Sequence, residues 1–419
     1  MKRGVRVSQR IGLGLLLLAA LAVAGPAGAR DVEVEVWLTM SAAEVNQIQA
    51  LLPQFERENP GIKVNVSGLA WTVYQDRVMS AFAAGLAPDV LMTGASFVWQ
   101  VANEGMGIPL NKYIENWEGY RDFAPSALQA SVYNGNIYGV PLQASTRAVW
   151  YRKDLFAEVG LDSEKPPDTW EGLRDAARRL TRWEGDRITR VGFNIPRDIL
   201  HPAFLTNDVS WFNADSTRAA FNNEAGLEAL TFWAEFAREM HYRDPGVRVA
   251  PFWEGGYGMI LNYPPTYAVV SGVDPDLWEE IGGPIVMQNR KKAAYTYPDW
   301  LYITSQSRNP DEAWKFIEWL MRPEILAEVK RHSQHTPPRR AAFDHPHYAG
   351  VAGELLRREF LEATLPYGAA FELWPNPLPM IDEFMRIWDA VALQQMSPQA
   401  GLIELEHRFN VMIDEVLNK

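Results

Sequence analysis

The sequence predicts an α/β protein with two domains. Three observations lead to this prediction: strand-like and helix-like segments alternate along the chain, the opening segments follow the order β-α-β-α-β, and the 419 residues exceed the length at which a single core usually stops growing. A β-α-β order is typical of a mostly parallel sheet flanked by helices. No flexible linker rich in Gly, Ser or Pro divides the chain, so we expect several crossing strands to join the domains as a hinge.

The first 29 residues have the three parts of a secretory signal peptide. Four basic residues among the first ten positions precede an apolar run from Ile11 to Gly25, and Ala27, Gly28 and Ala29 form a small-residue cleavage site. The apolar run is about 15 residues long, short of the ~20 that cross a bilayer as a helix. We expect export to the periplasm, cleavage after Ala29 and a soluble mature protein; the alternative is an uncleaved membrane anchor.

Composition limits the possible partners. The chain has no cysteine, so neither a lipid anchor on cysteine nor a disulfide can form, and the core alone must stabilise the fold. The signal peptide holds four of the 40 basic residues and none of the 52 acidic ones, so the net charge of −12 becomes −16 in the mature chain. Nucleic acid and anionic lipid both require clustered positive charge, which argues against them as partners.

Aromatic residues are unusually frequent, with 16 Trp, 15 Tyr and 18 Phe. Each one taken singly is most simply a core residue, but 16 Trp exceed what a core of this size usually needs. The C–H faces of sugar rings lie on flat apolar side chains of this kind. The composition therefore favours an aromatic-lined binding site.

Hydrophobic periodicity defines the elements of the first domain. Strict alternation predicts strands over residues 31–37 and 62–66, and a short apolar run predicts a buried strand over 88–92. Helical spacing predicts helices over 41–58 and over 74–85, the second ending at Gly85.

Later segments continue the alternation of strands and helices. Short apolar runs predict strands at 148–151, 258–263 and 301–304. A helix begins near Trp170, with Asp168 as N-cap and Glu171 completing a capping box. Residues 309–312 begin another helix, by a capping box and by a Pro at the first helical position. Helical spacing also predicts helices over 224–240 and 398–417.

Several segments resemble one known family when they are taken in order and with their spacing. They are L-P-Q-F-E with N-P-G at 52–61, A-A-G with A-P-D-V at 83–90, G-V-P with W-Y-R-K-D-L-F at 139–156, G-L with P-P-D-T-W at 160–170, and A-W-K-F-I-E-W-L at 313–320. Together they resemble the periplasmic solute-binding proteins of ABC importers, the family that includes maltose-binding protein and the glycerol-phosphate-binding proteins. Arg152 replaces the family's usual Asn, and residues 255–265 and 295–300 depart from its glycine-rich runs, which leaves the ligand open.

The resemblance implies a two-lobe periplasmic-binding-protein fold, in which each lobe is a mostly parallel sheet flanked by helices. Ligand would bind in the cleft between lobes, which close by a hinge motion. Lobe one would comprise residues 30–143 plus 296–343, and lobe two residues 147–293 plus 344–419. The chain would cross between the lobes near 143–147, 293–295 and 343.

The resemblance also implies that the protein performs no chemistry and needs no cofactor or metal. Its partners would be a small-molecule ligand, a carbohydrate of one or more units in view of the aromatic content, and the transmembrane subunits of an ABC permease. We expect a monomer that does not bind nucleic acid.

Candidate ligand-binding residues come from the carboxyl ends of strands and from the crossings, because ligands of open α/β sheets bind there. Trp and Tyr would stack on a sugar ring, while carboxylates, amides and Arg would pair with its hydroxyl groups. In chain order the candidates are Met40, Ser41, Glu44, Trp71, Tyr74, Ser96, Trp99, Ser145, Arg147, Trp211, Asn213, Trp253, Asn262, Tyr263, Tyr297, Asp299, Trp300, Arg339 and Trp374.

Structural alternatives remain open for several candidates. Trp99 follows apolar neighbours and fits a core position, and Trp71 fits a packing residue before a helix. Arg147 fits a structural ion pair, and Arg339 fits a surface position. A polyol, a glycerophosphodiester, a peptide or an organic anion remains possible as ligand, and the two Arg residues leave an anion open in particular.

Two other classes of protein are less well supported. A glycosidase needs two carboxylates at a defined separation, and no local motif singles out a pair among Glu44, Glu254 and Asp299. His332 with His335 and His345 with His347 are the close His pairs, and in a Pro-rich stretch we interpret them as surface residues rather than metal ligands.

Overall fold

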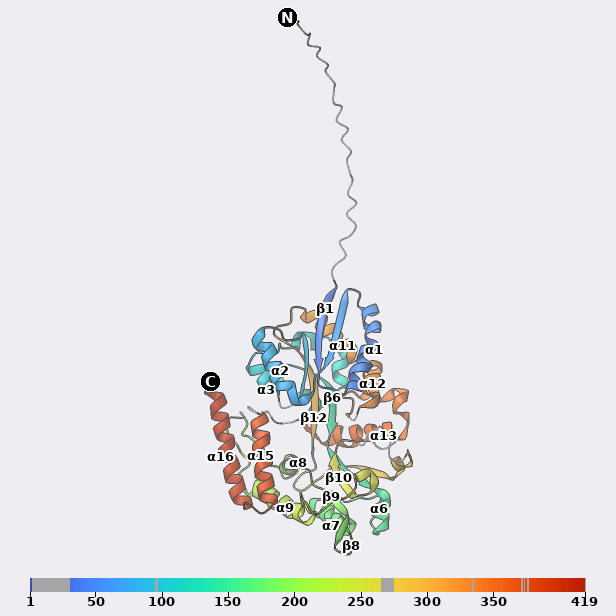
Figure 1. Cartoon of the computed structure of the whole chain (residues 1–419), viewed down its shortest axis with the longest axis vertical. Coiled ribbons are helices and arrows are strands. Elements are labelled where there is room, and N and C mark those ends of the chain that lie inside the picture. The colour runs from blue at the N-terminus through green and yellow to red at the C-terminus, as the bar shows by residue number, and fades with distance from the viewer. Residues whose placement is uncertain are drawn as a thin grey trace.

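The computed structural model describes residues 1, 31–94, 97–264, 275–333, 335–370, 372, 374 and 377–418. The predicted signal peptide, its cleavage site after Ala29 and the candidate Ser96 lie outside the described residues. Two β-sheets, each flanked by helices, form the two ends of the described molecule, and β6 and β12 of the first sheet extend toward the second (Figure 1). Within these described ranges, no helix combines the length and the apolar character needed to cross a bilayer.

The first sheet has six strands in the order β13-β12-β3-β1-β2, with β6 also paired to β12. They are β1 (Val32–Leu38), β2 (Ile62–Gly68), β3 (Val90–Gly94), β6 (Val140–Thr146), β12 (Ala294–Ile303) and β13 (Gly368–Ala370). β1 is parallel to β2 and β3, and β12 is antiparallel to β3 and β6. The alternation that predicted β1 and β2 buries one face of each strand, as expected for a half-buried sheet.

Helices α1 (Ala42–Glu58), α2 (Trp71–Ala84), α11 (Pro310–Leu320) and α12 (Pro323–Val329) flank this sheet. Ser41 caps α1, and Glu44 bonds back to the Ser41 backbone to complete a capping box. Phe55 of α1 contacts the rings of Phe316 and Trp319 in α11. The apolar faces of α1, α11 and α12 therefore meet in one core, while that of α2 lies in a smaller cluster with Trp300 and Tyr302.

The second sheet has five strands in the order β11-β7-β10-β9-β8. They are β7 (Ala148–Arg152), β8 (Arg182–Glu184), β9 (Arg187–Asn194), β10 (Tyr257–Asn262) and β11 (Ile281–Ile285). Only the β9–β10 pair among these described strands is parallel, so the expectation of a mostly parallel sheet does not hold for this one. The flanking helices are α6 (Lys153–Glu158), α7 (Trp170–Leu180), α8 (Leu200–Thr206), α9 (Glu224–Glu239), α15 (Pro377–Ala392) and α16 (Pro398–Leu417).

Short elements connect these layers. The helices among them are α3 (Val98–Asn103), α4 (Asn111–Ile114), α5 (Pro125–Gln129), α13 (Val351–Arg358) and α14 (Leu365–Tyr367). A two-stranded hairpin joins β4 (Val132–Tyr133) to β5 (Asn136–Ile137). The single turns of helix are η2 (Glu118–Asp122), η3 (Phe252–Glu254), η4 (Pro275–Glu280), η5 (Lys330–His332), η6 (Arg340–Asp344), η7 (Pro346–Ala349) and the π-helical η8 (Glu359–Thr364).

Local details of four predicted elements were wrong. Thr169, not Asp168, caps α7, because its hydroxyl accepts the Gly172 N–H while Asp168 pairs with Lys292. The capping box at the start of α11 does not form: Asn309 is the N-cap residue, but its side chain makes no cap hydrogen bond there. Helix α2 begins three residues before the predicted start, and β12 is longer than its predicted range.

Two crossing segments pass from one hydrophobic core to the other. Leu142 of β6 and Leu301 of β12 lie in the core of the first sheet. Val149 of β7 and Tyr295 of β12 lie in the core of the second. Only Arg147 separates β6 from β7, so an almost continuous strand and β12 run side by side between the cores (Figure 1).

Candidate functional site

The crossing strands bring four polar side chains onto one face. In the antiparallel register, Tyr297 lies opposite Ser145, and Asp299 lies opposite Gln143. Side chains of a strand alternate between faces, so residues 143 and 145 of β6 share a side, as do 297 and 299 of β12. Arg147 continues the same spacing at the junction with β7. Six side chains around this junction are at least partly exposed, and we call them the crossing site: Trp71, Arg147, Tyr263, Tyr297, Asp299 and His335.

A series of buried hydrogen bonds connects an ion pair to Asp299. Lys330 Nζ donates to Glu44 Oε1 at 3.0 Å and to the amide oxygen of Gln143. The amide nitrogen of Gln143 in turn donates to Asp299 Oδ2. The Lys330 side chain has 0% exposed surface and that of Glu44 has 5%, so this ion pair is screened little by solvent. We call Glu44, Lys330, Gln143 and Asp299 the relay.

Burial and neighbouring charges set opposite pKa shifts at the two ends of the relay. Burial alone raises the pKa of Glu44, but the charge and hydrogen bond of Lys330, with hydroxyl groups of Ser41 and Ser333, lower it to about 2. Burial raises the pKa of Asp299 to about 6, although the Gln143 amide and Lys330 oppose the shift. At pH 7 both carboxyls are ionised, and Asp299 acts as an acceptor.

Arg147 is held by a carboxylate and a carbonyl. Its guanidinium pairs with Asp198, donates to the Leu261 carbonyl at 3.2 Å and lies 5.8 Å from the centre of the Tyr263 ring. The Nε–H has no hydrogen-bond partner among the described residues. Because Asp198 neutralises its charge, Arg147 is less able to bind an anionic ligand than a free Arg would be.

Trp71 presents an exposed ring beside Asp299. Its side chain stacks on Tyr74 with ring centres 5.1 Å apart and an interplanar angle of 17°, and it meets the edge of Phe97. The residue is 49% exposed, whereas Tyr74 is buried beneath it. A Cβ on Gly94 would lie 3.2 Å from Asp299 Oδ1 and 3.6 Å from the Trp71 ring, so this glycine separates the carboxylate from the ring.

Tyr263 and His335 complete the site. The Tyr263 ring makes edge-to-face contacts with His335, with ring centres 5.0 Å apart, and with Tyr297, with ring centres 6.2 Å apart. Ser145 Oγ lies 3.3 Å from His335 Nδ1. Burial and the nearby Lys330 lower the pKa of His335 to about 4, so the ring is neutral at pH 7.

The charge of the site and relay is negative. Two cations, Arg147 and Lys330, are each paired with a carboxylate, Asp198 and Glu44. No described cation forms an ion pair with Asp299. Three carboxylates thus face two cations, and one negative charge remains for a ligand to meet.

Several predicted site residues lie elsewhere. Trp211, Trp300 and Trp374 have no exposed surface and fill the hydrophobic cores, so the structure does not bring them to the crossing site. Trp99 is buried in α3 as well. The Asn213 side chain closes its own loop by accepting the N–H groups of Thr217 and Arg218.

The remaining candidates have local structural contacts. Buried Arg339 pairs with Asp122 and donates to the Met321 carbonyl, which contradicts its interpretation as a surface residue. Trp253 packs in a satellite core beside β10, and Met40 packs against the first core. Asn262 is exposed at the end of β10, and its side chain accepts the N–H of Tyr263.

Four residues of this arrangement were missed as ligand-site candidates. Gln143 alternates with apolar Leu142 and Ala144, a period-two signal that could have identified it. Asp198 follows the carboxyl end of β9, the position that supplied other candidates. His335 was interpreted as a surface residue rather than a metal ligand, but it is partly buried against Tyr263 and Ser145. Nothing in the local sequence marks Lys330 as buried.

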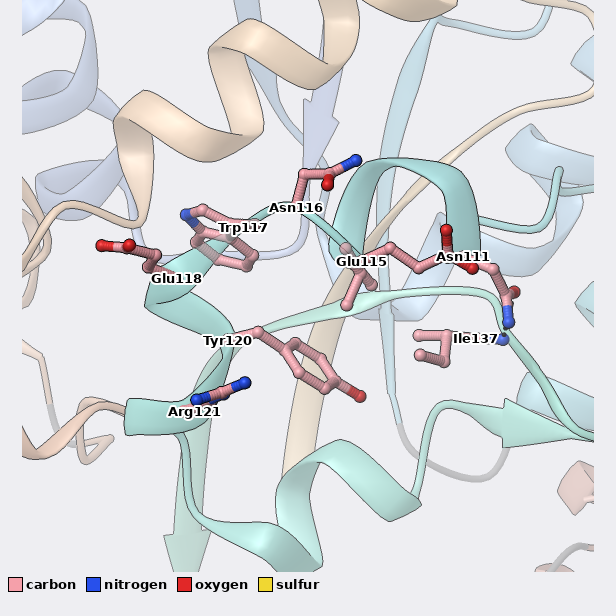
Figure 2. A pocket seen from close by; sticks show the side chains of 9 residues that line it. Asn111, Glu115, Asn116, Trp117, Glu118, Tyr120, Arg121 and Ile137 are labelled. Atoms are coloured by element: carbon pink, nitrogen blue, oxygen red, sulfur yellow. Dashed lines mark hydrogen bonds between the residues drawn. The ribbon is translucent and has the colours of Figure 1, made fainter.

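A separate pocket of about 520 Å³ lies away from the crossing site. Asn111, Glu115, Trp117, Tyr120, Arg121 and Ile137 are among its lining residues, and in Figure 2 the Tyr120 ring points toward Ile137. None of the predicted site residues lines it. The described residues contain no group of three His, Cys, Asp or Glu side chains that could hold a metal ion.

Comparison with known proteins identifies relatives along most of the chain. The model of the family described as bacterial extracellular solute-binding protein matches residues 41–326. A protein of Brucella abortus named as a binding protein is 26% identical over 335 residues, 77% of this chain and 80% of the relative. The sn-glycerol-3-phosphate-binding periplasmic protein of Escherichia coli K12 is 22% identical over 443 residues, 91% of this chain and 92% of the relative.

Solved structures share the fold at low sequence identity. The sugar-binding protein MalE of Xanthomonas citri superposes with a TM-score of 0.79 at 22% identity, covering 92% of this chain and 98% of MalE. A solute-binding protein of Thermotoga lettingae bound to α-D-tagatose gives a TM-score of 0.74 at 21% identity, covering 91% of this chain and 99% of that protein. The chain therefore has the two-sheet α/β periplasmic-binding-protein fold.

Proposed function

The chain belongs to the bacterial extracellular solute-binding protein family, whose members bind solutes and are not enzymes. From this premise we propose that it captures a neutral sugar at the crossing site and delivers the sugar to an ABC permease. Trp71 carries the proposal. The residue is 49% exposed, and its ring stacks on Tyr74 beside a carboxylate that can accept a hydrogen bond from a sugar hydroxyl. A sugar ring can use both an apolar face for stacking and a neighbouring acceptor for a hydroxyl group.

The names of the relatives point to two classes of ligand, sugars and glycerol 3-phosphate. Structural neighbours include proteins with bound tagatose and mannobiose, whereas the Escherichia coli relatives are named for glycerol 3-phosphate. The charge at the crossing site favours a neutral ligand. A phosphate would meet the uncompensated charge of Asp299 and two cations already paired with carboxylates, and a buried anion needs unpaired donors. Glycerol phosphate is thus the second candidate.

The mechanism of capture follows from the crossing strands. β12 reaches both hydrophobic cores, and β6 reaches the first core while β7, one residue further along the chain, reaches the second. Rotation of one sheet against the other would therefore bend the chain near Arg147 and near residues 293–295. We place lobe one at 30–143 plus 296–343 and lobe two at 147–293 plus 344–419. Ligand that contacts both lobes would stabilise a closed state, and the permease would recognise that state.

Export completes the proposal. The signal peptide would be removed after Ala29, and the mature chain would act in the periplasm as a monomer. Mass spectrometry of the protein recovered from the periplasmic fraction would give the mature N-terminus. A mature chain that begins at Arg30 supports the proposed cleavage, and an intact Met1 in the membrane fraction contradicts it.

Binding measurements on residues 30–419 test the function. Thermal melting would be followed with neutral sugars, polyols and glycerol 3-phosphate, because a ligand that binds only the folded state raises the melting temperature. Calorimetry would then give the affinity of the best ligand. Binding of glycerol 3-phosphate with no response to any sugar would reject the sugar and retain the family assignment.

Three variants locate the site. Trp71→Ala should lower sugar affinity at least tenfold, while Trp183→Ala removes a ring that is 51% exposed on β8 and should leave affinity unchanged. Tyr120→Ala tests the separate pocket shown in Figure 2. Loss of binding in Tyr120→Ala together with wild-type affinity in Trp71→Ala would move the ligand to that pocket and reject the crossing site.

A further inference from the structure

The relay has a fixed direction of hydrogen bonding. An ammonium group only donates, and the Lys330 side chain is fully buried, so each of its partners must be an acceptor. Gln143 therefore turns its amide oxygen toward Lys330. The amide nitrogen of the same side chain must then point the other way, where it donates to Asp299 Oδ2. The buried ammonium group of Lys330 thus selects one of the two orientations that the Gln143 amide could otherwise adopt.

The orientation of Gln143 has a consequence for Asp299. A donor at Oδ2 favours the ionised carboxylate, whereas a flipped amide would present an oxygen and favour a protonated one. With Oδ2 occupied, Oδ1 remains, and no described group donates a hydrogen bond to it. This oxygen lies on the side of Gly94 and the Trp71 ring, where the proposed ligand would bind.

We propose that Lys330 is a positioning residue for ligand recognition: acting through Gln143, it holds Asp299 as an acceptor whose Oδ1 receives a hydroxyl hydrogen of a sugar stacked on Trp71. The inference rests on the proposed function and names the group that selects the ligand. A ligand edge that carries only acceptors, such as a phosphate, is disfavoured at Oδ1 because neither partner can supply a proton.

Stability alone does not account for the relay. A buried ion pair is often no more stabilising than apolar residues of the same volume, because both ions lose their hydration. The Glu44–Lys330 pair joins the first turn of α1 to η5, and neither element contains a residue of the crossing site. The hydrogen bonds that connect the pair to Asp299 pass through the Gln143 amide.

The test uses a charge-neutral replacement of the ion pair. The double variant Glu44→Gln with Lys330→Met removes one buried charge of each sign and leaves the net charge unchanged, so the chain should fold with a melting temperature close to that of the wild type. Sugar affinity should fall at least tenfold, because the Gln143 amide is free to flip. Gln143→Met keeps the ion pair and removes the amide, and it should cause the same loss of sugar affinity. This variant provides the test if the double variant fails to fold.

A second readout does not depend on any ligand. Carbon-detected NMR of Asp-labelled protein, assigned with Asp299→Asn, would follow the titration of the Asp299 carboxyl. The titratable and charged groups that face it are Glu44, Lys330, Tyr74 and Tyr263. In Gln143→Met the midpoint should move to higher pH, since the donor to Oδ2 is lost; a purely structural role of the amide would leave it in place.

The outcomes separate the inference from the proposed function. An unchanged Asp299 titration and an unchanged sugar affinity in folded variants would overturn the positioning role and leave the binding function intact. A wild-type protein that binds no sugar would reject the proposed function, and the NMR titration would still decide whether the relay controls Asp299.

Discussion

Gly94 and Asp299 lie directly opposite each other on β3 and β12, and a Cβ on Gly94 would stand 3.2 Å from Asp299 Oδ1. The same Cβ would lie 3.6 Å from the Trp71 ring. Because glycine has no side chain, the free carboxylate oxygen and the exposed ring border the same space. Three segments far apart in the sequence therefore meet at a position where an added methyl group would occupy the room that a ligand needs.

The first prediction concerns Gly94→Ala. The methyl group should displace Asp299 or the ligand by a few tenths of an ångström and lower sugar affinity about tenfold, equivalent to ~1.4 kcal/mol. The free energy of unfolding should change by less than about 1 kcal/mol, because the nearest atom is the end of a side chain. Calorimetry and urea denaturation measure both quantities. Gly350→Ala, where the Cβ would meet no atom within 4 Å, is the matched control.

The second prediction concerns the pairing of Arg147. Asp198→Asn removes the carboxylate and leaves the guanidinium without a counter-charge, so the site gains one positive charge. Affinity for glycerol 3-phosphate or sulfate should rise several-fold, and affinity for a neutral sugar should change less. Asp186→Asn makes the same change of charge at an exposed turn. An equal gain in both variants would show that net charge, not Arg147, is responsible.

Periodicity was sufficient to predict most elements of this fold. β1, β2 and α16 occur close to where alternation or helical spacing placed them, because each buries one regular face. Caps were less predictable. Asp168 and Thr169 can both cap a helix, and the choice depended on the distant Lys292, which pairs with Asp168.

The site was less predictable than the fold for a physical reason. Trp71 and Trp300 are the same residue type in similar aromatic contexts, yet one is 49% exposed and the other fully buried. Which tryptophan is covered depends on contacts between segments, such as that of Gly139 with Trp300, which local sequence does not reveal. Lys330 is the extreme case, because a lysine is seldom fully buried and its partners come from positions 44 and 143.

The third prediction tests the core position of Trp300. A Cβ at Gly139 would stand only 1.9 Å from an atom of the Trp300 ring, and that ring has no room to move. Gly139→Ala should therefore destabilise the protein by about 3 kcal/mol, as overpacking does, with little effect on sugar affinity where the protein remains folded. Urea denaturation measures the loss. Wild-type stability in this variant would mean that Trp300 can leave the core and would reopen it as a ligand residue.

The fourth prediction concerns Glu359, a fully buried carboxyl between the crossing segments. Its Oε1 accepts from the Thr146 backbone N–H at 2.6 Å and from the Thr364 hydroxyl at 2.8 Å, and Oε2 accepts from the Thr336 hydroxyl at 2.6 Å. None of these partners is a cation. Burial raises the pKa of Glu359 to about 7, although the hydrogen bonds from the threonines lower it in part.

This shift makes stability depend on pH in a definite direction. Between about pH 4.5 and 7 the folded state retains a proton that the unfolded state has released, so stability falls as pH rises through this window and then levels off. The loss amounts to about 3 kcal/mol. Glu359→Gln has no such proton, so relative to the wild type it should gain stability from pH 5 to pH 8. Urea denaturation at both pH values, with the exposed Glu118→Gln as control, measures the difference. A gain of equal size in the control would mean that the pH dependence does not come from Glu359. No gain in Glu359→Gln would mean that Glu359 is ionised in the folded protein throughout this range and that its hydrogen bonds to the three threonines suffice to hold a buried charge.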